Sequence, residues 1–129
     1  MAIYTGKRKP LRLGQPFVEN FIPLGRTETV IYLVVVNAHP TFVKIGRTRG
    51  WVTRRKAYAS WNLSAGNGIL SERVFRLTEE YVDLEKLEKD LIATMPFAKA
   101  YGNEWFIAEI DEMGRLVDRF LCAHDISYI

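Results

Sequence analysis

The chain has 129 residues, of which 48% are hydrophobic and 26% charged, and its net charge is +3. This length fits one domain with one modest core, and the composition is that of a folded globular domain, which excludes a wholly disordered chain. The single cysteine, Cys122, excludes an intramolecular disulfide and a multi-cysteine metal site. The longest apolar run, residues 30–36, is too short to cross a bilayer, so we expect no membrane partner and a cytoplasmic location.

The first 28 residues differ from the rest of the chain because prolines and glycines interrupt any regular period. They carry five basic residues, including Lys7, Arg8 and Lys9, against the two acidic residues Glu19 and Glu28. We therefore predict a basic N-terminal arm over residues 1–28 and a folded domain over residues 29–129.

The first half of this domain reads as a hairpin, a helix and a third strand. Residues 30–36 are β-branched and aromatic, which predicts a strand buried on both faces. A turn follows at residues 37–40, and residues 41–45 form a second strand that ends at Gly46, so the two strands should pair as an antiparallel hairpin. We expect a helix from residue 51 to about residue 60 and a strand over residues 69–77.

The second half holds two amphipathic helices. Apolar residues recur at spacings of three and four between residues 84 and 95, after a candidate cap at Asp83 or Thr78 and before Pro96. A short strand over residues 104–110 precedes a last helix, in which we expect Cys122 to be a core residue. The order β-β-α-β-α-β-α predicts an α/β (α+β) fold with a small, mainly antiparallel sheet of three to four strands flanked by helices.

Charge is distributed unevenly along the chain. Between residues 44 and 56 there is no acidic residue, but there are six basic ones: Lys44, Arg47, Arg49, Arg54, Arg55 and Lys56. Eleven of the 15 acidic residues lie instead between Glu72 and Glu112. The basic segment predicts a surface that binds the DNA backbone, and the acidic region is a candidate cation site; a solvated basic loop and helix is the alternative.

Two tripeptides at a defined spacing suggest a family. Val-Ile-Tyr at residues 30–32 and Lys-Ile-Gly at residues 44–46, with eleven residues between them, resemble the signature of the GIY-YIG nuclease superfamily. Arg54, Glu88 and the sequence Gly-Asn-Glu-Trp-Phe at residues 102–106 are similar to features of its phage-associated DNA-binding branch, whose second tripeptide commonly reads Lys-Ile-Gly. The resemblance extends from residue 29 to about residue 110.

The resemblance implies a divalent-metal-dependent endonuclease that hydrolyses DNA phosphodiester bonds. It implies that Glu88 binds Mg²⁺ or Mn²⁺, that Arg54 binds the phosphate and that Tyr32 lies near the attacking water. Without the resemblance, Tyr32 is a core tyrosine with its hydroxyl at a sheet edge. Lys44 stands where many members of the superfamily have a catalytic tyrosine. This lysine favours assignment to the phage-associated branch, and it also favours the alternative of an inactive DNA-binding module. A third alternative is a small phage effector that binds a host protein.

Several assignments remain open between neighbouring residues. Helical neighbours lie three and four positions apart, so Glu88 should lie at the edge of the apolar stripe and Glu85 should be more exposed. A carboxylate against the core requires a compensating metal or arginine, which favours Glu88 as the metal ligand and leaves an arginine-paired structural glutamate as the alternative. Alignment to the family favours Arg54 over Arg55. For Lys44 we favour a phosphate contact over a role as base.

Glu104 and Asn103 are further candidate site residues, near the end of the segment that resembles the family. Glu104 is either a second acidic site residue or the edge of an amphipathic strand. Asn103 either positions a water molecule or makes the turn.

Overall fold

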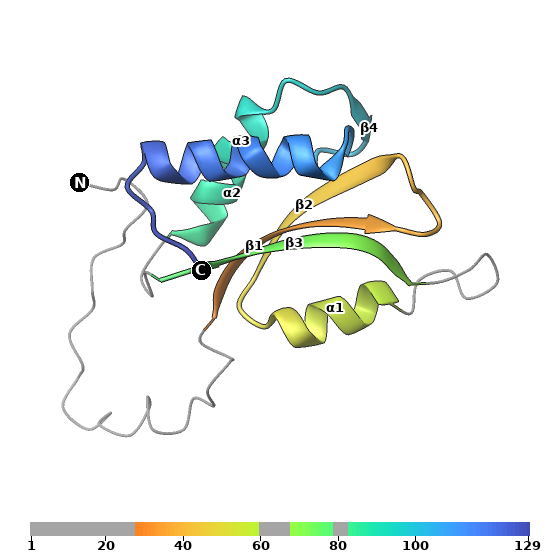
Figure 1. Cartoon of the computed structure of the whole chain (residues 1–129), viewed down its shortest axis with the longest axis horizontal. Helices are drawn as coiled ribbons and strands as arrows, with labels where there is room; N and C mark the ends of the chain where they lie inside the picture. The colour runs from red at the N-terminus through yellow and green to blue at the C-terminus, as the bar shows by residue number, and fades with distance from the viewer. Residues whose placement is uncertain (1–27, 60–67, 79–82) are drawn as a thin grey trace.

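The computed structural model describes residues 28–59, 68–78 and 83–129 (Figure 1). Its elements in chain order are β1 (Thr29–Val36), β2 (Phe42–Thr48), α1 (Trp51–Ala59), β3 (Ile69–Leu77), α2 (Leu84–Thr94), β4 (Lys99–Tyr101), β5 (Trp105–Ile107) and α3 (Ile110–Ala123). The strands form one antiparallel sheet in the order β3-β1-β2-β5-β4. The predicted α+β class is confirmed, with five strands where we expected three to four. The predicted arm, apart from Glu28, lies outside the described residues.

The central strand β1 is buried on both faces, as its sequence predicts. One face, with Ile31 and Leu33, packs in a core that includes residues of α2 and α3. The other face, with Tyr32 and Val34, packs in a second core that includes Trp51 of α1. The sheet is therefore the middle layer, with α2 and α3 on one side and α1 on the other (Figure 1).

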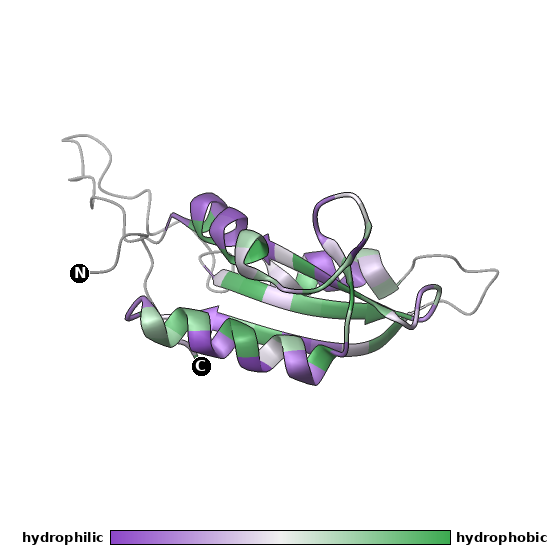
Figure 2. Cartoon of the chain, turned by 90° about the horizontal axis from the view of Figure 1, so that it is seen from above, coloured by the Kyte–Doolittle hydropathy of each residue, from purple (hydrophilic) through white to green (hydrophobic). Residues whose placement is uncertain are grey.

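The two longer helices follow their predicted apolar patterns. α2 is capped by the Asp83 side chain, which accepts a hydrogen bond from the Lys86 amide, and it ends at Thr94, before Pro96. α3 buries Met113, Val117 and Leu121. In Figure 2 the strands are largely hydrophobic, while the helices carry both hydrophobic and hydrophilic residues. The expectation for Cys122 was wrong, because its side chain is exposed and lies 3.8 Å from Asp118 Oδ1.

Two strand boundaries differ from the sequence prediction. β2 does not end at Gly46 but continues to Thr48, and Gly46 pairs directly with Tyr32 of β1. The predicted strand at residues 104–110 is instead the second half of a short hairpin, β4–β5. Gly102 turns that hairpin with a φ of 61°, a conformation that glycine adopts without a steric penalty.

Candidate functional site

The second half of β2 forms an open edge of the sheet. β5 pairs with β2 only over Phe42, Val43 and Lys44, and the Ile45 amide donates one further hydrogen bond of 3.0 Å to the Glu104 carbonyl. Beyond Ile45, β2 pairs among the described strands only with β1. Since α1 and α2 cover opposite faces of the sheet, side chains from both faces can meet at this edge (Figure 1).

Tyr32 reaches this edge from inside the core. Its side chain is fully buried, its hydroxyl lies 2.7 Å from the hydroxyl of Tyr58, and its ring centroid lies 4.7 Å from that of Trp51. Burial, together with the hydrogen bond to Tyr58, raises the pKa of Tyr32 well above its usual value. The phenol of Tyr32 is therefore neutral at physiological pH.

Arg54 and Arg55 occupy different environments although they are neighbours on α1. Arg54 lines the first of two cavities at this edge together with Arg47, and its positive charge opposes the upward shift in the pKa of Tyr32 and of Glu88. Arg55 Nε instead donates to both carboxylate oxygens of Glu72 on β3, at 3.0 and 2.9 Å. Because β3 is the edge strand on the other side of β1, Arg55 is held away from the β2 edge.

Glu88 comes to the site from α2 with a side chain that is only 12% exposed, whereas Glu85 is exposed. Arg47 Nε on β2 lies 3.8 Å from Glu88 Oε1, which is a loose ion pair. Burial, and after it the charge of Glu104, raises the pKa of Glu88, while Arg47 and other nearby cations oppose this shift. The Glu88 carboxylate is thus close to the core and only partly compensated, as the helical pattern predicts.

Lys44 forms a close ion pair with Glu104. The two atoms Nζ and Oε2 lie 2.5 Å apart, and the Lys44 side chain is only 13% exposed. Lys44 Nζ also lies 6.0 Å from the centroid of the Tyr32 ring. The charge of Lys44 is therefore compensated within the protein by Glu104, and Lys44 adjoins Tyr32.

Two cavities of about 460 Å³ each lie along this edge and share Arg47 and Glu85. The first is also lined by Thr48, Arg49, Arg54 and Asp83. The second is also lined by Glu88, Lys89, Lys99, Asn103 and Glu104. Arg47 and Glu85 thus border both cavities, whereas Tyr32 and Lys44 line neither of them.

The structure brings together Tyr32, Lys44, Arg54 and Glu88, the four predicted catalytic residues. The six residues predicted to bind DNA are less uniform. Within the described ranges, three of the six pair with an acid: Lys44 with Glu104, Arg47 with Glu88, and Arg55 with Glu72. Arg49 donates to the Thr29 hydroxyl and Lys56 is exposed on α1. The basic segment is consequently less strongly cationic in space than in sequence.

The oxygen donors of the second cavity suit a hard divalent cation. They are the carboxylates of Glu85, Glu88 and Glu104 and the amide oxygen of Asn103. Within residues 28–59, 68–78 and 83–129 there is no cluster of three or more His, Cys, Asp or Glu side chains arranged to hold a metal. Mg²⁺ commonly takes one or two carboxylates and completes its shell with water and substrate phosphate, so this donor set fits a cation that binds together with a phosphodiester.

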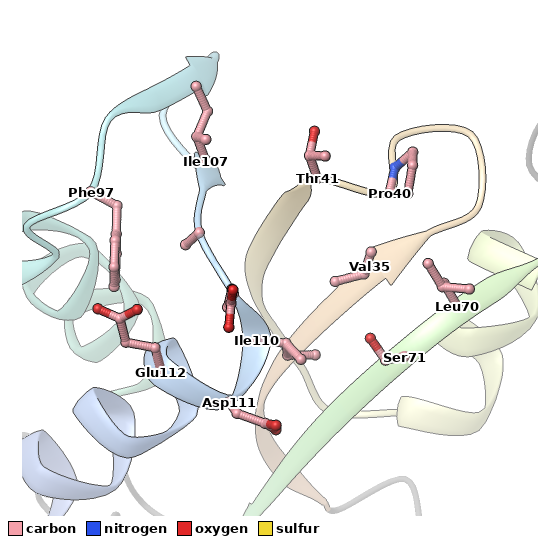
Figure 3. A pocket seen from close by; sticks show the side chains of 12 residues that line it. Val35, Pro40, Thr41, Leu70, Ser71, Phe97, Ile107, Ile110, Asp111 and Glu112 are labelled. Carbon is pink, nitrogen blue, oxygen red and sulfur yellow. The ribbon is translucent and has the colours of Figure 1, made fainter.

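A larger cavity of about 710 Å³ lies elsewhere, beside the β1–β2 turn and the start of α3 (Figure 3). Its lining includes the apolar side chains of Val35, Leu70 and Ile107 together with Asp111 and Glu112. None of the predicted site residues borders it. The tyrosine pair, the cations Lys44 and Arg47 and the carboxylates of Glu88 and Glu104 converge instead at the β2 edge.

Tyr58 is a residue of this site that the sequence did not identify. Its hydroxyl is the partner of Tyr32, and it lies four residues after Arg54 on α1. Residues four apart share one face of a helix, so this spacing was the available signal.

Comparisons of the chain with known protein families, with curated proteins and with solved structures give no match. No helix in the part of the chain that the structure describes is long and apolar enough to cross a membrane.

Proposed function

We propose that this chain is a GIY-YIG-like DNA-binding domain that hydrolyses DNA phosphodiester bonds with a divalent metal ion. The observation that supports the proposal is the convergence of Tyr32, Arg54 and Glu88 at one open sheet edge. These residues come from β1, α1 and α2, and they are the residues to which the motif resemblance assigns site roles.

Each side chain suits one part of the reaction. The planar, permanently charged Arg54 guanidinium binds two phosphate oxygens at once. Glu88, with Glu104 beside it, would hold Mg²⁺ or Mn²⁺, and such an ion supplies charge stabilisation and an activated water. Tyr32 supplies a neutral hydroxyl held in place by Tyr58.

A second candidate is a DNA-binding module without turnover. The Lys44–Glu104 ion pair favours it, because Lys44 places a compensated charge where many members of the superfamily have a tyrosine hydroxyl. Metal-dependent nicking of supercoiled DNA separates the candidates, since only the nuclease turns over.

The DNA contact is tested by measuring duplex affinity at several salt concentrations. With about four to five phosphates neutralised, log K should fall with log salt at a slope of about −4. Arg54→Gln should weaken binding and make the slope shallower by about 1, because an arginine–phosphate contact is lost. Arg55→Gln is the matched control and should change little, since Glu72 already compensates Arg55. No binding at low salt, or a slope near zero, would contradict the proposal.

A further inference from the structure

The two cavities at the β2 edge share Arg47 and Glu85. Arg49 and Arg54 border the first cavity, and Lys89, Lys99 and Asn103 border the second, while Arg47 borders both. The sequence drew attention only to the basic segment that lines the first cavity. Lys89 is on α2 and Lys99 opens β4, so the second group of cations comes from outside that segment.

The charges of the second cavity leave its two lysines available to an anion. Glu104 is held by Lys44 at 2.5 Å, and Glu88 faces Arg47 at 3.8 Å. Glu85 is the remaining acid of the lining, and it is exposed. Lys89 and Lys99 are exposed as well, and no ion pair engages either of them among the described residues.

From this arrangement we propose that Lys89, Lys99 and Asn103 form a second phosphate-binding subsite, and that one DNA strand crosses the site through both cavities. The inference rests on the proposed function and specifies its substrate. Lysine ammonium groups and asparagine amides are common ligands of the DNA backbone, and they position a strand without reading its sequence. A strand bound on both sides of Arg47 places an internal phosphodiester there and requires no chain end.

The test measures the affinity of the full chain for a duplex oligonucleotide as a function of salt. The variant is Lys89→Gln/Lys99→Gln. Lys86→Gln is the matched control, because Lys86 is exposed on the same helix and lines neither cavity. Loss of two phosphate contacts should weaken binding about 10-fold at low salt and make the slope shallower by about 2. The control should stay within about 2-fold of the wild type, as expected for a lysine that makes no phosphate contact.

The outcomes distinguish the inference from the proposed function. If the wild type binds DNA and Arg54→Gln weakens it, but Lys89→Gln/Lys99→Gln behaves like Lys86→Gln, the second subsite is refuted and the function stands. If the wild type shows no salt-dependent binding, the proposed function fails first. Circular dichroism checks the fold of each variant. Should the double variant misfold, the single variants Lys89→Gln and Lys99→Gln replace it, and each should then make the slope shallower by about 1.

Discussion

The phenol ring of Tyr32 lies over the backbone of Gly46, its direct partner on the neighbouring strand. A Cβ atom at residue 46 would lie 2.2 Å from both Cζ and Oη of Tyr32. Gly46 is therefore needed for space and not for an unusual backbone angle. This contact gives a physical reason for a glycine after Lys44 and Ile45, since a larger residue would displace the tyrosine at the centre of the proposed site.

Gly46→Ala should lower the free energy of unfolding by about 1–3 kcal/mol, because Tyr32 is packed against Trp51 and bonded to Tyr58 and has little room to move. Denaturant unfolding measures the change. Gly114→Ala is the control: a Cβ there meets only ordinary contacts at 3.9 and 4.0 Å, and alanine in the interior of α3 should stabilise the protein by about 0.5–1 kcal/mol. Equal stability of Gly46→Ala and wild type would show that Tyr32 does not depend on this glycine.

The buried hydroxyl pair of Tyr32 and Tyr58 should behave as one unit. Tyr58→Phe leaves the Tyr32 hydroxyl buried without its partner and should cost about 1–3 kcal/mol of unfolding free energy. Tyr32→Phe/Tyr58→Phe should cost less than the two single changes together, because no polar group is then left unpaired. A double-mutant cycle by chemical denaturation gives the coupling energy, and strict additivity would argue against the bond.

The Lys44–Glu104 ion pair should contribute more to stability than an exposed pair. Glu104→Gln leaves the mostly buried Lys44 ammonium without a countercharge, so we expect a loss of about 1–3 kcal/mol in unfolding free energy. Glu72→Gln removes the acid that pairs with Arg55, whose side chain is 48% exposed, and should cost about 1 kcal/mol or less. Urea unfolding at pH 7 measures the loss of unfolding free energy in both variants. A smaller loss for Glu104→Gln than for Glu72→Gln would contradict this ranking.

Glu88 should make stability depend on pH in a defined direction. Its pKa is raised in the fold, mainly by burial and then by Glu104, so the fold favours the protonated form. The stability that this group contributes is complete below the unfolded pKa of about 4.3 and is lost as pH rises through the folded pKa.

Glu88→Gln mimics the protonated form and should therefore unfold at a higher temperature than wild type at pH 7 in metal-free buffer. The difference should shrink toward about pH 4, where the wild-type residue is itself protonated. Glu85→Gln, at an exposed position of the same helix, is the control and should show little difference. A melting temperature of Glu88→Gln below that of wild type at pH 7 would mean that the pair with Arg47 outweighs burial.

The hydrophobic pattern predicted most of the fold. The unbroken apolar run of β1 predicted a strand covered on both faces, and the leucine spacing of α2 predicted its core face and the placement of Glu88 against Glu85. The β4–β5 hairpin was missed because each strand has only three residues, too few to show an alternating pattern. The prediction for Cys122 was wrong because it relied on the tendency of cysteine to be buried. Cys122 follows the buried Leu121 on α3 and therefore lies on another face of the helix, where it is exposed.

Tertiary pairing explains what the sequence could not predict about the site. Lys44 and Glu104 are 60 residues apart, and neither residue type reveals the other as its partner. Likewise, nothing local distinguishes Arg54 from Arg55; the difference arises because Glu72 on β3 engages Arg55. The ion pairs that reduce the charge of the basic segment likewise depend on the folded sheet.

The most direct test of the proposed nuclease activity is nicking of supercoiled plasmid with Mg²⁺ or Mn²⁺ by wild type, Glu88→Ala and Glu85→Ala. We predict nicking by wild type only when the metal is present. We predict a loss of about 100-fold or more in rate for Glu88→Ala, with fold and DNA affinity retained, because several kcal/mol of charge stabilisation are removed. Glu85→Ala should remain active. Wild-type rates in a folded Glu88→Ala, or no nicking by wild type with any divalent metal, would contradict the nuclease assignment.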